Sequence, residues 1–532
     1  MTASLIFLYG PPGSGKSTIG RILAESLKIP FHDLDVEIEN ASGCSVVQIF
    51  AEQGESGFRA LEHQVIEPLF SLGTGVIALG GGSLTNPAVR ALVEAKGSIV
   101  CLHAVPEVLL LRLQPDQEKR PLLAGKAAQR LADLLAQRGE HYASFPVQLD
   151  TTQLDPTQAA WEIQILLGRF HIKNSNPPYE ICIQPGGLGT LGQELSGRGL
   201  HGPFAIVADS NTAPLYARRV AVSLDEAEFL HSLMVIPAGE TSKTLTSAQK
   251  LWENFLDAGL ERDSTVIALG GGVVGDLAGF AASTYMRGIQ WVDVPTTLLA
   301  MVDSSLGGKT GVDIPRGKNL VGAFHPPSYV LVDPELLATL PEVEFRSGLA
   351  EVVKHGIIAD PGLLKLCSAF KSPHDQALPA RGDPSDWDVQ DLLRLVSRAM
   401  AVKVGIIEAD PYEKGERAAL NLGHTIGHAM EQVSGFSIRH GEAVAIGMVV
   451  EARLAEHLGL AETGLSRQIA TLLADLGLPA EIPGNLDPKT IQTAIRVDKK
   501  KKQGIVRFAL PTRIGSVRIG VDVPDDVLVS EI

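Results

Sequence analysis

Residues 10–17 carry the clearest chemical pattern in the sequence, Gly-Pro-Pro-Gly-Ser-Gly-Lys-Ser. It matches the phosphate-binding loop G-x-x-x-x-G-K-[ST], in which glycines let backbone N–H groups wrap phosphate oxygens and the lysine reaches the outer phosphates. An apolar run at 4–9 and an amphipathic stretch at 17–27 give the strand–loop–helix context that argues against a chance glycine-rich turn. The loop predicts ATP-dependent phosphoryl transfer, with Lys16 catalytic, Ser17 on Mg²⁺, and the nucleotide held by Gly13, Ser14, Gly15, Lys16, Ser17 and Thr18.

A second glycine-rich turn follows an apolar run, in Thr-Val-Ile-Ala-Leu-Gly-Gly-Gly-Val-Val-Gly-Asp at 265–276. A strand that ends in such a turn allows a pyrophosphate to approach the backbone closely. The spacing departs from G-x-G-x-x-G, so the turn alone is a weak signal. Polar strings at 237–243, 285–288, 295–309 and 317–320 strengthen it, because polar strings between apolar runs are typical of binding loops.

Four side chains in the C-terminal half have the types that bind a transition metal, namely Glu351, His424, His428 and His440. One carboxylate and two imidazoles leave open positions and suit a catalytic Zn²⁺. By spacing, His424 and His428 lie at i and i+4 on one helix face, which makes them the first candidates for joint ligands. For each histidine alone, the alternative is a hydrogen-bonded residue of the core.

Alternating strand and helix patterns must position these residues, which predicts an α/β protein. Over residues 1–170, apolar runs and amphipathic stretches predict one α/β domain around the phosphate-binding loop, with a parallel sheet and helices on both faces. A breaker-rich segment at 171–178 predicts a linker. Residues 179–341 are expected to form an α/β NAD-binding domain, and 342–532 a mainly helical metal- and substrate-binding domain that closes in a short, basic, β-rich tail.

Composition excludes several classes of protein. The 532 residues include 46 Lys and Arg against 61 Asp and Glu, a net charge of −15, which makes nucleic acid and anionic membrane poor partners. The four cysteines show no Cys-x-x-Cys spacing, and there is no signal-peptide pattern or run of 18 apolar residues. We therefore expect a globular cytoplasmic protein. The one dense basic run, Lys499–Lys502, is typical of a solvated patch or an anion contact.

Residues 1–170 resemble shikimate kinase, on the loop at 10–17 together with the segments at 33–35, 58–62, 80–82 and 120–123. A planar arginine suits the substrate carboxylate, and an aspartate suits the nucleophilic hydroxyl. Taken singly, the arginines are typical of helix-face ion pairs, and a related small-metabolite kinase such as a gluconate kinase is the alternative. The resemblance implies that Asp33 orders Mg²⁺ through water and that Arg120 is a catalytic lid residue that contacts ATP. It also implies that Asp35 is catalytic. The implied shikimate contacts are Asp35, Arg59, Gly81, Gly82 and Arg138.

From Pro177 onward, the turn at 270–275, the polar strings around it and the glutamate and histidines resemble 3-dehydroquinate synthase. This revises the metal assignment: the ligands of Zn²⁺ or Co²⁺ would be Glu351, His424 and His440, and His428 would contact substrate. Ser347 stands where the family has Asn. The resemblance implies an NAD site formed by Asp209, Asn211, Glu240, Lys243, Gly271, Gly272, Val273, Asp276, Thr296, Thr297, Lys309, Lys318, Leu336 and Thr339.

The synthase substrate would be a seven-carbon keto acid phosphate, for which lysine and arginine are the natural ligands. By the resemblance, Lys309, Lys354, Lys403, Glu413 and His428 would be catalytic, with Glu413 suggested in proton transfer. The implied substrate contacts are Arg287, Asp303, Lys309, Asn319, Lys354, Lys403, Arg417, Asn421, His428 and Lys499.

Together the resemblances imply a bifunctional enzyme that phosphorylates shikimate and converts 3-deoxy-D-arabino-heptulosonate 7-phosphate to 3-dehydroquinate with loss of phosphate. They also imply a homodimer through the synthase half and small molecules as the partners. A metal-dependent polyol dehydrogenase is one alternative, which the anion-binding lysines and arginines disfavour. Other sugar-phosphate cyclases remain open. A degenerate regulatory module would be expected to lack Lys16, Asp35 or a metal ligand, and all are present.

Overall fold

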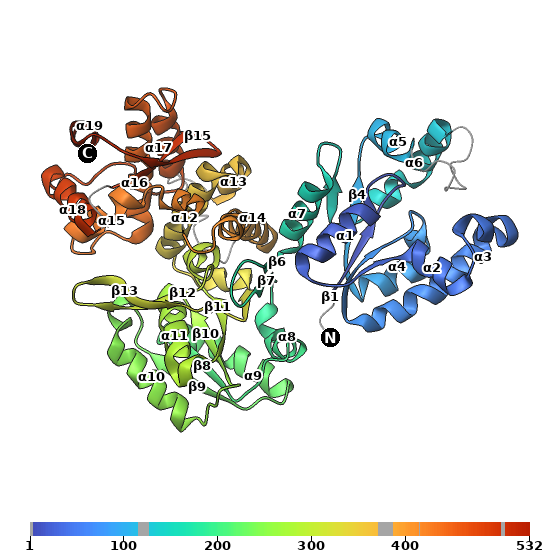
Figure 1. The fold of residues 1–532 in the computed structure, drawn as a ribbon, viewed down its shortest axis with the longest axis horizontal. Helices are drawn as coiled ribbons and strands as arrows, with labels where there is room; N and C mark the ends of the chain where they lie inside the picture. Colours follow the sequence, from blue (N-terminus) through green and yellow to red (C-terminus); the bar gives the residue numbers. More distant parts are fainter. Residues whose placement is uncertain (1–3, 115–126, 371–386, 414, 502–505) are drawn as a thin grey trace, which may run out of the picture. The chain divides into compact units, whose positions relative to one another are not determined.

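The structure is a computed structural model that describes residues 4–114, 127–370, 387–413, 415–501 and 506–532. It contains two compact units, residues 1–171 and 172–532 (Figure 1). Each unit is built on a parallel sheet, which confirms the predicted α/β class.

The first unit has a five-stranded parallel sheet with the order β2-β3-β1-β4-β5. The central strand, β1, is the apolar run that ends at the phosphate-binding loop. This places the loop at the middle of the carboxyl edge of the sheet, where ligands of such sheets bind. The strands are β1 (Ser4–Tyr9), β2 (Phe31–Asp33), β3 (Thr74–Ala78), β4 (Gly97–His103) and β5 (Gln148–Asp150).

Alternate side chains of β1 enter two different cores. Ile6 and Leu8 pack with α1 and α7, whereas Leu5 and Phe7 pack with α2, α3 and α4 on the opposite face. Successive strand side chains point to opposite faces, so the continuous apolar run requires helices on both faces, as predicted. The helices are α1 (Lys16–Leu27), α2 (Leu34–Ser42), α3 (Val46–Leu69), α4 (Pro87–Glu94), α5 (Pro106–Leu113), α6 (Ala127–Ala143) and α7 (Pro156–Leu167).

The second unit is built on a seven-stranded sheet with the order β6-β7-β14-β11-β10-β8-β9, whose first strand in the sequence, β6, spans the division between residues 171 and 172. Pairing from β7 through to β9 is parallel. The apolar runs at 204–208, 233–236, 265–269 and 330–332 each predict a strand, and β8, β9, β10 and β14 form there, while β6, β7 and β11 complete the sheet. The strands are β6 (Arg169–Ile172), β7 (Tyr179–Ile183), β8 (Phe204–Asp209), β9 (His231–Ile236), β10 (Thr265–Gly270), β11 (Gln290–Pro295) and β14 (Tyr329–Val332).

Helices and a hairpin cover this sheet. α10 and α11 share one apolar core with β8, β9 and β10, and the β12–β13 hairpin packs against α11. The elements are α8 (Leu191–Gly197), α9 (Arg218–Glu226), α10 (Leu245–Asp257), α11 (Gly272–Thr284), β12 (Lys309–Ile314) and β13 (Gly317–Phe324).

Residues from 342 form the mainly helical part, as the periodicity predicts. The helices are α12 (Glu342–Ile358), α13 (Pro361–Cys367), α14 (Val389–Ala409), α15 (His424–Val433), α16 (His440–His457) and α17 (Leu465–Asp475). In Figure 1 this part is drawn from yellow to red, and α15 and α16 lie side by side.

The C-terminal tail differs from the expected β-rich segment. The first three lysines of its basic run lie at the end of α18 (Pro488–Lys501), and the fourth is outside the described residues. After them, β15 (Phe508–Arg513) and β16 (Ser516–Val521) form a hairpin before α19 (Asp525–Glu531). The helix forms because Ile491 and Ile495, four residues apart, are both buried in the core around α15 and α16. Tertiary burial thus outweighs the charged composition of the segment.

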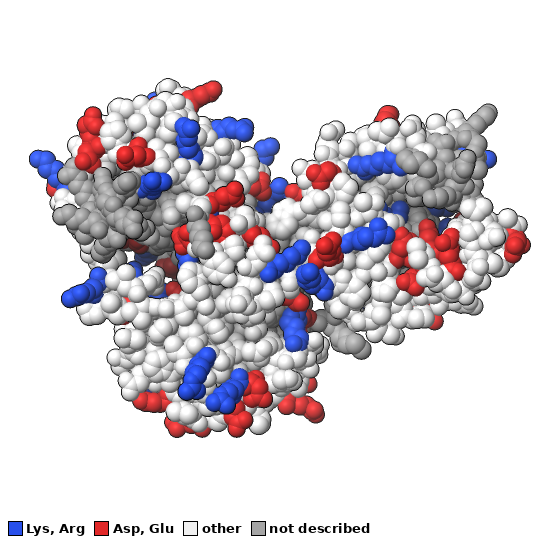
Figure 2. Space-filling model, in the orientation of Figure 1, with Lys and Arg blue, Asp and Glu red and all other residues white. Residues whose placement is uncertain are grey.

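The described surface carries both signs of charge, and Figure 2 shows acidic and basic side chains interspersed over the visible face of both units. Within the described ranges, no helix is long and apolar enough to cross a membrane.

Candidate active sites

The phosphate-binding loop of the first unit joins β1 to α1. Gly13 and Gly15 have φ values of +83° and +96°, and a Cβ on Gly13 would lie 2.7 Å from the carbonyl oxygen of Leu109. Lys16 is the first residue of α1, and its Nζ donates to the carbonyl oxygens of Gly10 and Pro11 at 2.9 and 3.1 Å. Among the described residues, no side chain caps the N-terminus of α1, so its backbone N–H groups suit a phosphate.

The predicted shikimate-binding residues converge at the carboxyl end of β3. Arg59 lies on α3 and Arg138 on α6. A Cβ on Gly82 would clash with Arg59 Nη2 and would lie 2.8 Å from Arg138 Nη1. A Cβ on the neighbouring Gly80 would lie 3.7 Å from Asp35 Oδ1. Two guanidinium groups, a carboxylate and a glycine turn therefore surround one position, a geometry that fits a small carboxylic acid with hydroxyl groups.

Several supporting residues of this pocket are absent from the sequence prediction. Glu62 accepts from Arg59 Nη1 at 2.7 Å and from the hydroxyl of Ser83. Tyr9 and Tyr142 donate to the carbonyl oxygen of Gly81 at 3.2 and 2.7 Å, beside a 3.2 Å bond from Arg138. For Glu62 the signal is its i+3 spacing from Arg59 on one helix face, whereas the tyrosines reach Gly81 only through the tertiary fold.

Of the predicted kinase residues Asp33 and Arg120, the structure describes Asp33. Asp33 ends β2, and its carboxylate accepts from the backbone N–H of Asp35 at 3.1 Å, so it caps α2. Arg120 lies outside the described residues. Arg112, which the sequence prediction does not include, donates to Thr151 at 2.7 and 3.0 Å, and Thr151 in turn donates to the carbonyl of Ser14 in the loop at 3.4 Å.

In the second unit, twelve of the fourteen predicted NAD-binding residues lie at or just after the carboxyl ends of five neighbouring parallel strands, whereas Lys309 and Lys318 lie on the β12–β13 hairpin. Asp209 ends β8, Asn211 follows it, and Gly271 follows β10. Such a sheet edge is the usual ligand-binding edge of an α/β fold. The other members are Glu240 and Lys243 after β9, Gly272, Val273 and Asp276 at the start of α11, Thr296 and Thr297 after β11, and Leu336 and Thr339 after β14.

This edge has the features that fit a dinucleotide. Among the described residues, no side chain caps α11, so its N-terminal N–H groups suit a pyrophosphate. The Oγ1 atom of Thr296 is buried and has no hydrogen-bond partner in the described structure. Lys243 binds Asp276 at 2.5 Å and Asn319 at 2.6 Å, and Lys318 lies 3.7 Å from Glu240. The chemistry and placement of these groups are compatible with NAD.

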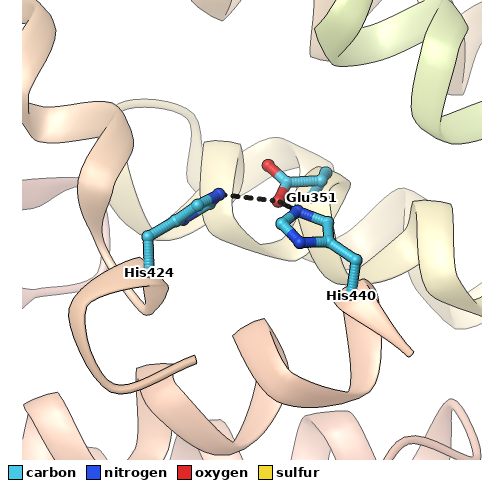
Figure 3. A group of neighbouring side chains, drawn as sticks. All are labelled: Glu351, His424 and His440. Atoms are coloured by element: carbon cyan, nitrogen blue, oxygen red, sulfur yellow. Dashed lines mark ion pairs between the residues drawn. The ribbon is translucent and has the colours of Figure 1, made fainter. Parts of the chain in front are cut away.

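Three elements place the predicted metal ligands together. Glu351 lies on α12, His424 begins α15 and His440 begins α16. The Nε2 atoms of His424 and His440 lie 3.6 and 3.5 Å from Glu351 Oε1, and Figure 3 shows both rings pointing to this carboxylate. Their ligand atoms lie within 4.8 Å of one another.

The surroundings of the Glu351 carboxylate favour its charged form, which is the form that binds a metal ion. It is 0% exposed, its Oε2 forms an ion pair with Lys354, and its Oε1 accepts no hydrogen bond among the described groups. Burial acts to raise the pKa of Glu351, but Lys354 and the two imidazoles outweigh it and hold the pKa well below its usual value. The buried Oε1, which accepts no hydrogen bond, and the two converging imidazoles fit a divalent metal.

His428 lies one turn after His424, and the two ring centroids are 5.1 Å apart. The i, i+4 spacing thus places these imidazoles side by side, but the Glu351 cluster contains His440 in place of His428. His428 instead groups with Glu431 and His440. Glu431 was not predicted from the sequence.

Buried cations flank the metal cluster. Lys403 Nζ lies 2.7 Å from Asp303 Oδ1, and Lys354 is 1% exposed. Burial acts to raise the pKa of Asp303, but Lys403 and Lys354 outweigh it and lower it, while burial lowers the pKa of Lys403. His355, which was not predicted, is fully buried near Glu351, and burial lowers its pKa to about 4.

The other predicted substrate residues are less uniform in position. Lys309 forms an ion pair with Glu413 at 2.5 Å. Arg417 is buried and donates to the carbonyl oxygen of Pro411 at 2.9 Å. Asn421 ends the 3₁₀ turn before α15. Within the described residues, no hydrogen bond or ion pair joins Arg287 to the others; it lies between α11 and β11. Lys499 lies on α18, but its side chain is outside the described part. Ser347 Oγ accepts from Gly441 N at 3.1 Å, which fixes the start of α16 beside His440.

Comparisons with known proteins match both units. Family models match residues 12–167 as shikimate kinase, 233–347 as 3-dehydroquinate synthase N-terminal and 348–501 as 3-dehydroquinate synthase C-terminal. The 3-dehydroquinate synthase of Symbiobacterium thermophilum is 48% identical over 324 residues, 61% of this chain and 88% of that protein. That of Nostoc punctiforme is 44% identical over 352 residues, 66% of this chain and 94% of that protein.

A solved structure of a different synthase is similar to the second unit. The 2-epi-5-epi-valiolone synthase from Streptomyces hygroscopicus subsp. jinggangensis, with NAD⁺ and Zn²⁺ bound, is 29% identical, with a TM-score of 0.59 over 66% of this chain and 95% of that chain. The chain therefore belongs to the 3-dehydroquinate synthase family, carries a shikimate kinase domain ahead of the synthase, and is a bifunctional enzyme of the shikimate pathway.

Proposed function

We propose that the first unit transfers the γ-phosphoryl group of ATP to a hydroxyl of shikimate with Asp35 as the group that accepts the hydroxyl proton. The convergence of Arg59 and Arg138 on Gly82 carries this proposal, because it provides two guanidinium groups for one carboxylate. Asp35 lies across the same glycine turn. Lys16 neutralises the transferred phosphoryl group, and Ser17 and Asp33 hold Mg²⁺ directly and through water.

We propose that the second unit converts 3-deoxy-D-arabino-heptulosonate 7-phosphate to 3-dehydroquinate. When bound, NAD supplies a reversible hydride acceptor and a metal at Glu351, His424 and His440 supplies a Lewis acid. The cations Lys309, Lys354, Lys403 and Arg417 bind the phosphate and the carboxylate, together with the remaining predicted substrate contacts. Glu413 and His428 move protons. Asp303 keeps the Lys403 ammonium in place through their 2.7 Å ion pair.

Identity values favour this substrate over those of other sugar-phosphate cyclases. The curated 3-dehydroquinate synthases are 44 and 48% identical to this chain. The valiolone synthase is 29% identical, and a 2-deoxy-scyllo-inosose synthase with bound NAD⁺ and Co²⁺ is 25% identical. The cluster of lysines and arginines also opposes a polyol dehydrogenase, whose neutral substrate needs none of them.

We also propose a homodimer through the synthase half and a cytoplasmic location. Support for the dimer comes from Leu233 and Val235, both 50% exposed on β9, the last strand of the seven-stranded sheet. All four cysteines are free, which suits a reducing compartment.

We propose that the kinase ends at Gly168 and that β6 belongs to the synthase. β6 is a strand of the seven-stranded sheet, and the backbone N–H groups of Lys173 and Asn174 bond Glu408 Oε1 on α14 at 2.7 and 3.1 Å. On this view residues 173–178 connect β6 to β7 within the synthase, whereas the sequence alone suggests a linker over 171–178.

Separate expression of residues 1–168 and 169–532 tests this assignment and both activities. We expect each fragment to catalyse only its own reaction, with kcat/KM within about threefold of the intact chain, or about 0.65 kcal/mol. A matched pair, 1–172 and 173–532, removes β6 from the synthase and should lower its melting temperature. A folded 169–532 fragment more than about a hundredfold slower than the intact chain would show that the two units complete one another's sites.

A further inference from the structure

His440 lies between two carboxylates that approach opposite sides of its ring. Its Nε2 is 3.5 Å from Glu351 Oε1, and its Nδ1 is 3.4 Å from Glu431 Oε1. Glu351 comes from α12, whereas Glu431 comes from α15, so the ring is approached from two different elements. The side chain of Glu431 is 12% exposed, which shields its interaction with the ring from water.

The other ligand imidazole has the same arrangement. His424 directs Nε2 to Glu351 at 3.6 Å, while its Nδ1 lies 3.2 Å from the carbonyl oxygen of Leu422. Each ring therefore presents Nε2 to the metal cluster and Nδ1 to an acceptor. In metal sites such an outer acceptor fixes the tautomer and the ring orientation of the ligand histidine.

We propose that Glu431 is the positioning residue of the metal centre, holding His440 with its proton on Nδ1 so that the Nε2 lone pair faces the metal. This rests on the proposed ligand roles of Glu351, His424 and His440. His440 belongs to two groups of possible metal ligands, one with Glu351 and His424 and one with His428 and Glu431. The proposal explains the second group without a second metal ion. In this account the synthase site binds one metal ion, and Glu431 does not touch it.

Nearby contacts favour the outer role over a second metal site. Glu431 belongs to the same helix as His424, so one rigid element sets both the first ligand and the partner of the second. The start of α16 is fixed independently, through the 3.1 Å bond from Gly441 N to Ser347 Oγ. With its backbone fixed by α12, His440 retains mainly ring rotation, and Glu431 restrains that rotation.

The test compares Glu431→Gln with the parent chain by competition for zinc against a chromogenic chelator. We expect zinc affinity to fall by about 10- to 100-fold, the range found when an outer partner of a ligand histidine is removed. The cobalt-loaded variant should show an altered ligand-field spectrum at an unchanged ratio of one ion per chain. Glu442→Gln is the matched control, because Glu442 lies two residues from His440 but bonds the backbone of Arg439 at 3.1 Å; its zinc affinity should stay within about threefold of the parent.

Folding and the ligand assignment are checked separately. Shikimate kinase activity and NAD binding of each full-length variant should match the parent, and melting temperatures are measured with chelator present. Parent-like zinc affinity in Glu431→Gln overturns the proposal for Glu431 alone. A parent that binds two ions, of which Glu431→Gln loses one, overturns it in favour of a second metal site. A parent that binds no zinc overturns the ligand assignment as well.

Discussion

Lys16→Ala is expected to lower ATP-dependent phosphorylation of shikimate by at least about 10³-fold, or about 4 kcal/mol of transition-state stabilisation, without changing the synthase reaction. The lysine ends in the phosphate-binding loop, where its Nζ donates to the carbonyl oxygens of Gly10 and Pro11. Alanine is a strong helix former and suits the first position of α1. Both reactions are measured on the same preparation by coupled assay.

The matched control is Lys96→Ala, which removes an exposed lysine of the same unit away from the loop. It should retain both activities. Equal loss of both activities in folded Lys16→Ala would contradict the assignment of the two reactions to separate units.

His424→Ala and His440→Ala are each expected to lose the bound zinc and, with it, synthase activity, whereas His428→Ala keeps zinc and loses at least about 100-fold in turnover. The reason is geometric, because both predicted ligands place Nε2 within 3.6 Å of the orphaned Glu351 oxygen. Elemental analysis of the purified chains gives the metal content, and phosphate release gives the turnover.

His457→Ala is the control for this series, because His457 is a histidine of α16 that pairs with Glu531 at 2.9 Å away from the cluster. It should keep zinc and activity. A zinc-free His428→Ala protein would restore the ligand pair that the i, i+4 spacing suggests and would refute the assignment of His428 to the substrate.

The local motifs could be predicted from the sequence because each is contained in one strand, turn and helix. The loop at 10–17 and the turn at 270–275 lie where the apolar run before each of them predicts. The metal cluster could not be derived from spacing, because His440 begins a different helix from His424 and joins Glu351 only when α12, α15 and α16 pack. The family resemblance, not periodicity, supplied that residue.

Supporting residues escaped prediction for a related physical reason. Glu62 and Glu431 are acidic residues on amphipathic helices, where sequence alone indicates a solvated face. Their roles emerge from distances to Arg59 and His440. The C-terminal tail was expected to be β-rich, because its basic composition gives no indication that Ile491 and Ile495 anchor turns of a helix.

The central claim is that one chain carries two complete and separate sites, and its most direct test uses one preparation of the full-length enzyme. One sample of the enzyme receives 3-deoxy-D-arabino-heptulosonate 7-phosphate with a trace of NAD, and a parallel sample receives shikimate with ATP and excess Mg²⁺. Each assay is run with and without a zinc-selective chelator. The account predicts phosphate release equal to 3-dehydroquinate formed, no net NADH, and loss of this reaction alone with chelator. Accumulation of NADH in proportion to product, or failure of either reaction in fully metal-loaded protein, would contradict it.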